Sequence, residues 1–75
     1  MRRVGTVVRT AGGLAIARTA SEAEPPRIGS SVVDESLATV GRVVDVFGPA
    51  ERPYVAVTPS GDDLTALVGG KLYAR

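Results

Sequence analysis

Hydrophobic and polar residues alternate over short stretches of this chain, and Gly, Pro and Ser separate these stretches from one another. Alternation with a period of two predicts β-strands, because successive side chains of a strand point to opposite faces. No stretch sustains the 3.6-residue period of a helix, although residues 62–69 fit a single helical turn. The predicted strands are residues 3–10, 14–19, 39–47, 53–58 and 70–74, with the short stretch 32–34 as a sixth strand if it forms one, so that five or six strands are expected.

The connections between these strands carry turn residues. Gly12 and Gly13 predict a tight hairpin turn between the first two strands. Residues 20–31 contain two adjacent prolines and three serines and predict a surface loop, since proline cannot donate to a β-ladder. We expect residues 35–38 to form a turn and Pro59 to end the fifth strand.

The stretch 39–47 gives the strongest strand signal, yet neither of its faces is uniformly apolar. One face would hold Val40, Arg42, Val44 and Val46, and the other Gly41, Val43, Asp45 and Phe47. A β-bulge shifts the phase of the alternation, because it adds one residue to one strand of a pair. We therefore predict a bulge near Asp45.

The apolar residues are small, which favours an all-β fold. There are twelve Val and ten Ala but one Phe and no Trp, and Val suits a pleated, half-buried surface. A 75-residue chain forms one domain, residues 1–75, and buries only about 60% of its unfolded surface. Closure into a small barrel would remove exposed strand edges. A core this small also suggests oligomerisation or docking on a partner, since binding stabilises the folded state.

The side chains exclude several kinds of chemistry. There is neither Cys nor His, so we expect no disulfide, no metal site, no cofactor and no catalytic residue. Gly12 and Gly13 have no helix after them, so they lack the helix terminus that holds phosphates. Asp62 and Asp63 follow a Ser-Gly pair, where Asp is usual in a turn. An enzyme is therefore not expected.

The charge balance argues against strong independent binding to nucleic acid. The net charge is +1, and eight of the nine cations are Arg. An RNA-facing stripe would form only if the strands align Arg9, Arg18, Arg42 and Arg52. The alternative is that these four residues are ordinary surface cations, and the near-neutral charge balance favours this alternative. Arg52, beside Glu51, is expected to be solvated. No run approaches the ~20 apolar residues of a membrane span, so we expect a soluble, cytoplasmic protein.

The stretch VDVFGPAERPYVAV, residues 44–57, contains the only Phe and one of the two Tyr. Turn chemistry accounts for Gly48 and Pro49, because proline pre-sets φ in a turn. It does not account for Phe47 or Tyr54. They would either pack across the hairpin or form the core of an interface, and periodicity does not distinguish these alternatives.

GRVVDVFGPAERPYVAV at residues 41–57, followed by VGGKLY at 68–73, resembles the Gar family of small β-barrel subunits in H/ACA ribonucleoproteins. The IART stretch at 16–19 and VVDESLATVG at 32–41 are also similar to this family, so the resemblance covers nearly the whole chain. The residues on the core pattern are Gly41, Val43, Asp45, Phe47, Gly48, Pro49, Pro53, Tyr54, Val57, Gly70, Leu72 and Tyr73.

The resemblance implies a six-stranded split β-barrel similar to the second domain of translation elongation factors. It implies a non-catalytic subunit that binds a dyskerin-like pseudouridine synthase and assists substrate RNA placement and release during rRNA pseudouridylation and ribosome biogenesis. Guide RNA and the other H/ACA proteins would be reached indirectly. The chain has no Arg-Gly-Gly repeats, so it is similar to the archaeal-type form, and we expect direct RNA contact to be weak or absent.

On this hypothesis the partner-binding residues lie on both sides of the predicted hairpin loop. They are Val46, Phe47, Gly48, Pro49, Pro53 and Tyr54, with Val44 and Val55 beside them. The alternative is a translation-factor-like barrel that binds RNA or ribosomal particles directly, which would show salt-dependent RNA affinity on its own.

Overall fold

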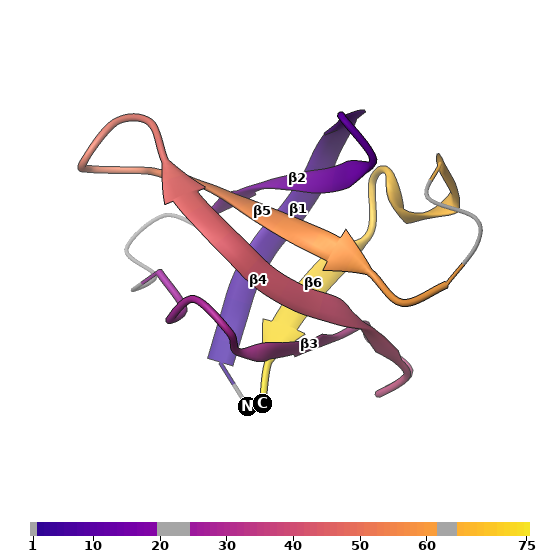
Figure 1. Cartoon of the computed structure of the whole chain (residues 1–75). Helices are drawn as coiled ribbons and strands as arrows, with labels where there is room; N and C mark the ends of the chain where they lie inside the picture. The colour runs from indigo at the N-terminus through magenta and orange to yellow at the C-terminus, as the bar shows by residue number, and fades with distance from the viewer. Residues whose placement is uncertain (1, 20–24, 62–64) are drawn as a thin grey trace.

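Six strands and one short 3₁₀ helix form the described part of the chain, residues 2–19, 25–61 and 65–75 of the computed structural model (Figure 1). Every predicted strand is present, and each bound lies within one residue of its prediction. The elements are β1 (Arg2–Ala11), β2 (Leu14–Thr19), β3 (Ser31–Val33), β4 (Thr39–Phe47), β5 (Tyr54–Pro59), the 3₁₀ helix η1 (Thr65–Leu67) and β6 (Lys71–Ala74). The helical turn predicted within 62–69 is η1; residues 62–64 lie outside the described residues.

The strands close into a barrel in the order β1-β2-β5-β4-β3-β6, and every neighbouring pair is antiparallel. The predicted small all-β barrel is therefore confirmed. The seam between β3 and β6 rests on two residue pairs, Val32 with Ala74 and Val33 with Tyr73. A closed barrel leaves few strand edges open to other chains, which suits a chain of this composition.

Small side chains fill the barrel. Ala15 and Ala17 of β2 face inward and are fully buried, whereas Arg18 on the other face is exposed. Leu72 is the largest fully buried side chain. The core cluster consists of Val4, Val7, Ala15, Ala17, Val32, Val40, Val43, Val55, Val57, Leu72 and Ala74. Alternation within β2 therefore places its small residues inside, as the narrow interior requires.

The predicted bulge in β4 is confirmed. The pairing of β4 with β5 shifts between Val43 and Asp45, so Val44 is the additional residue. Val44 is 40% exposed, whereas Val43 before it belongs to the core. The bulge explains why neither face of the stretch alternates cleanly, because the phase changes at this point.

Gly41 of β4 pairs with Pro59 of β5 and leaves no room for a side chain. A Cβ atom at this position would overlap the carbonyl oxygen of Thr58, which β5 presents to it. Only glycine fits such a close backbone approach. Gly41 thereby allows β4 and β5 to pair at this point.

Candidate docking surface on the β4–β5 hairpin

The β4–β5 hairpin carries the residues expected to bind a partner, and it projects from one side of the barrel (Figure 1). Phe47, the last residue of β4, pairs directly with Tyr54, the first residue of β5. The amide N–H of Arg52 donates to the carbonyl oxygen of Pro49 at 3.2 Å and closes the turn between the strands. The hairpin is therefore a defined turn on two paired strands.

The rings of Phe47 and Tyr54 stack on each other. Their centroids are 5.7 Å apart and their planes are inclined by 24°. Gly48 has a φ of 95°, and a Cβ atom on it would lie 2.9 Å from Cδ2 of Tyr54. The tyrosine ring thus lies against a backbone that only glycine adopts without strain. Of the two alternatives that the sequence left open, the structure shows cross-strand packing of the two aromatic residues.

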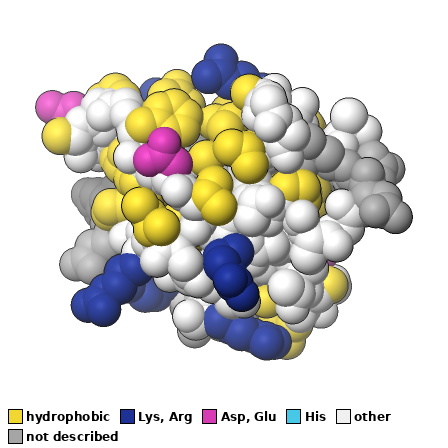
Figure 2. All heavy atoms as spheres, in the orientation of Figure 1, with side chains coloured by type: hydrophobic (Ala, Val, Ile, Leu, Met, Phe, Trp, Pro, Cys, Tyr) yellow, Lys and Arg dark blue, Asp and Glu magenta, His cyan; other side chains and the backbone are white. Residues whose placement is uncertain are grey.

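Both rings lie outside the barrel core. Phe47 is 38% exposed and Tyr54 is half-buried, and neither belongs to the core cluster. Gly48 and Pro49 are exposed beside them. Figure 2 shows hydrophobic side chains gathered on the face over the β4–β5 hairpin. We use the name hairpin surface for Val44, Phe47, Gly48, Pro49 and Tyr54.

Three of the expected docking residues lie beneath this surface. Pro53 is buried, and its carbonyl oxygen accepts the amide N–H of Thr19 at 3.2 Å and the Thr19 hydroxyl at 2.8 Å. Val55 is fully buried in the core, and Val46 packs against the core from a half-buried position. These residues hold the hairpin in place and expose little surface of their own.

Thr19 is a supporting residue that the sequence did not reveal. It is the only buried polar residue among those described, and its hydroxyl bridges the end of β2 to the start of β5. Its partner is 34 residues away along the chain. No local pattern predicts a contact at that separation, so the sequence contained no signal for it.

Arg52 is exposed at the hairpin tip, in agreement with the expectation that it is solvated. Its Nε–H also donates to the carbonyl oxygen of Thr19 at 2.9 Å, a contact that the sequence did not indicate. This contact links the tip of the hairpin to the last residue of β2. Arg52 therefore fastens the hairpin to β2.

The remaining arginines of the expected stripe do not form a single line. In the strand register Arg18 pairs with Tyr54, Arg9 pairs with Ile16, and Arg42 pairs with Thr58. The three guanidinium groups therefore belong to three different rows of the barrel wall. Arg18 alone stands beside the hairpin surface.

Two carboxylates, those of Asp45 and Asp34, accept hydrogen bonds from residues close to them in the sequence. The Oδ1 atom of Asp45 accepts the amide N–H of Val46 at 2.8 Å. In the β3–β4 turn, hydrogen bonds from the Ser36 hydroxyl and the Ala38 amide lower the pKa of Asp34 below its ordinary value.

Within residues 2–19, 25–61 and 65–75 there is no group of three His, Cys, Asp or Glu that could hold a metal ion. The described residues also include no helix with the length and apolar character to cross a membrane.

The fold and the hairpin surface define a small antiparallel β-barrel with an exposed, stacked aromatic pair. Residues 1–75 match the family model described as Gar1/Naf1 RNA binding region, so the chain belongs to the Gar1/Naf1 family. The chain is also 34% identical, over 73 residues, to an uncharacterized protein of Methanocaldococcus jannaschii; the match covers 97% of this chain and 83% of that protein. Members of the family are non-catalytic ribonucleoprotein components, and membership assigns the chain to the proteins associated with H/ACA ribonucleoproteins.

Proposed function

We propose that this chain is a non-catalytic subunit of an H/ACA guide-RNA particle and that it docks on the pseudouridine synthase through the hairpin surface. The observation that carries the proposal is the stacked Phe47–Tyr54 pair, which lies outside the core and remains accessible to solvent. Aromatic side chains are enriched among the residues that dominate interface energetics.

The hairpin surface is preorganised for binding. The ring stack, the Gly48 backbone and the Arg52 hydrogen bond to Thr19 restrict the hairpin before any partner arrives. A surface that is already ordered loses less conformational entropy on association. Pro53 and Val55 support this order from below, because both are buried.

The subunit would assist placement and release of substrate RNA without a catalytic group of its own. A docked barrel influences a mobile segment of its partner only if it contacts the open and closed states with different free energies. The chemistry would belong to the synthase, and guide RNA and other particle proteins would be reached through it. We place this activity in the cytoplasm, in rRNA pseudouridylation and ribosome biogenesis.

A second candidate function is direct binding of RNA or ribosomal particles by the isolated barrel. The observation in its favour is Arg18, which is exposed and pairs with Tyr54 in the strand register. A cation beside an aromatic ring is a common arrangement for binding single-stranded nucleic acid. This candidate predicts that the hairpin surface binds RNA in the absence of any other protein.

Affinity purification from native extract tests the proposed function. The tagged chain should retain a pseudouridine synthase, and Phe47→Ala should lose it. Val68→Ala is the matched control, because Val68 is also an exposed apolar residue, at 47%, but lies near η1 and away from the hairpin. Recovery of RNA without a synthase would instead support direct RNA binding, and equal recovery of the synthase by Phe47→Ala would refute docking through the hairpin.

A further inference from the structure

Two neighbouring rows of side chains cross the outer wall of the barrel at the hairpin surface. In the first row Arg18 of β2 pairs with Tyr54 of β5, and Tyr54 pairs with Phe47 of β4. Residues that pair directly across strands have their side chains on the same face of the sheet. This row therefore begins with an exposed cation and ends with the two stacked rings.

The second row ends in a charge of the opposite sign. Ile16 of β2 pairs with Ala56 of β5, and Ala56 pairs with Asp45 of β4. Each of these residues is two positions along its strand from a member of the first row, so both rows lie on the outer face. Ile16 and Ala56 are buried but do not belong to the core cluster. They therefore extend the apolar part of the outer wall beside the rings.

Asp45 is an exposed carboxylate among apolar neighbours. Ala56 lies across the strand pair from it, and Val44 and Phe47 lie on either side of it along β4. Its Oδ1 atom accepts the amide N–H of Val46 at 2.8 Å, and within the described ranges 2–19, 25–61 and 65–75 its Oδ2 atom has no partner. Oδ2 is therefore available to a cation of another molecule.

The two charges lie on opposite sides of the aromatic and apolar residues. Arg18 belongs to β2 and Asp45 to β4, and β5 separates these strands. Two strand spacings amount to about 10 Å, which is too far for an ion pair between them. A polyanion would be attracted by Arg18 and repelled by Asp45. A protein surface that carries both signs of charge fits this arrangement better, because its charges can complement both groups.

We propose that the synthase surface that receives the hairpin has an apolar pocket for the ring pair, a carboxylate opposite Arg18 and a cationic side chain opposite Asp45. The inference rests on the proposed function and deepens it, because it specifies the chemistry of the partner and the orientation of docking. Complementary charges at the edge of an interface fix its register and speed association, and a reversed orientation would bring like charges together. Arg18 and Asp45 are therefore specificity-determining residues, whereas the rings supply most of the affinity.

Binding kinetics of the purified synthase with two single-charge variants, measured at several salt concentrations, test this arrangement. Arg18→Gln and Asp45→Asn change the net charge of the chain in opposite directions. Both should nevertheless weaken binding, by roughly three- to tenfold and mainly through slower association, and both should reduce its dependence on salt. Asp45→Asn retains an oxygen that can accept the Val46 N–H, so its urea midpoint should stay close to that of the wild type.

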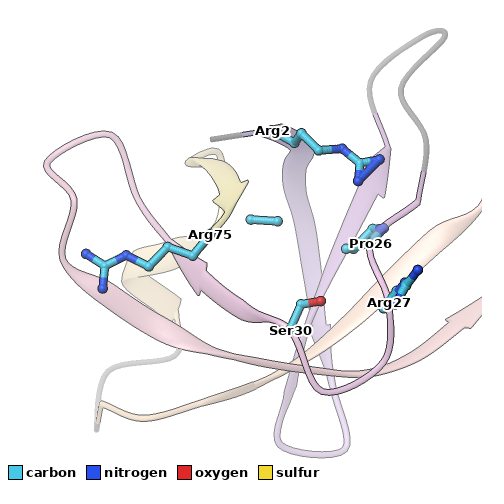
Figure 3. A pocket seen from close by; sticks show the side chains of 6 residues that line it. Arg2, Pro26, Arg27, Ser30 and Arg75 are labelled. Atoms are coloured by element: carbon cyan, nitrogen blue, oxygen red, sulfur yellow. The ribbon is translucent and has the colours of Figure 1, made fainter.

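Arg75→Gln and Glu35→Gln are the matched controls, because both side chains are exposed and both lie away from the hairpin. Arg75 follows β6, which lies opposite β5 in the closed strand order, and its side chain extends away from Arg2 and Arg27 (Figure 3). Glu35 lies in the β3–β4 turn, at the other end of β4 from the hairpin. Each control should bind the synthase within about twofold of the wild type.

The sign of the two effects decides the inference. Stronger binding by either Arg18→Gln or Asp45→Asn would indicate a partner surface of one charge and would overturn it, as would losses no larger than those of the controls. If Phe47→Ala still loses the synthase in that case, docking through the hairpin stands and only the charge arrangement fails. Equal binding by Phe47→Ala and the wild type, or binding of single-stranded RNA in place of the synthase, would refute the proposed function and this inference together.

Discussion

Gly48 is the residue on which the arrangement of the two rings depends most directly. Its φ of 95° is a backbone conformation that other residues rarely adopt, and a Cβ atom would press on the Tyr54 ring. We predict that Gly48→Ala lowers the free energy of unfolding by about 1–3 kcal/mol, as measured by urea denaturation. Gly61→Ala is the control, because nothing lies within 4 Å of its added Cβ; an equal loss in both variants would contradict this explanation.

The Thr19 hydroxyl makes the second residue-scale contribution. It donates to the buried Pro53 carbonyl, so Thr19→Val retains the shape but removes the hydrogen bond. We expect thermal or urea unfolding to show a loss of about 1–2 kcal/mol. The exposed Thr58 provides the comparison, and Thr58→Val should change stability by less than about 0.5 kcal/mol. An unchanged stability of Thr19→Val would show that the bond contributes nothing net.

At the scale of elements, the β3–β4 turn should give the fold an acid-sensitive component. The Asp34 carboxylate accepts hydrogen bonds from the Ser36 amide and hydroxyl and from the Ala38 amide, and these bonds lower its pKa below 3.8. A group whose pKa is lower in the folded state stabilises the fold above its unfolded pKa, and the stabilisation is lost as the pH falls through the folded value.

Urea midpoints measured from neutral pH down to about pH 2 test this linkage. The wild-type midpoint should exceed that of Asp34→Asn near neutral pH, and the difference should shrink once the pH falls below 3.8. We expect a small effect, because the hydrogen bonds to this carboxylate lie at the solvent-exposed surface. Parallel pH profiles for the two proteins would rule out a contribution from Asp34 ionisation.

Individual elements were predictable to the extent that their determinants are local. Alternation and turn residues located six strands, and the broken alternation at Asp45 located the bulge. Contact between Phe47 and Tyr54 across the hairpin was one of two alternatives that the sequence left open, because both residues flank its turn. The long-range contacts were not predictable: Arg52 and Pro53 bind Thr19, more than thirty residues away. Only the folding of the strands into the barrel brings Thr19 close to Arg52 and Pro53.

The same limit applies to the candidate surfaces. The sequence indicated six docking residues but not how deeply each one is buried. In the structure Pro53 is buried and Val46 packs against the core, whereas Phe47 and Pro49 are exposed. Spacing along a strand does not reveal how deeply a residue is buried once a bulge shifts the phase of the alternation.

At the scale of the whole molecule, the barrel presents an exposed aromatic pair on a core of small residues. The hairpin surface is ordered, because its two rings stack on each other. A partner that binds only the folded chain stabilises it by mass action, which would supplement a core built from Val and Ala. A subunit of this kind would therefore be more stable within its particle than alone.

The central claim is that the hairpin surface docks on the pseudouridine synthase, and a binding titration of the purified synthase with wild-type and Phe47→Ala chains tests it most directly. If Phe47 is at the centre of the interface, the variant should lose about 2 kcal/mol or more, which is roughly a thirtyfold weaker Kd. Its barrel should remain folded, because the ring lies outside the core cluster. Equal affinity of the two chains, with both folded, would contradict the account.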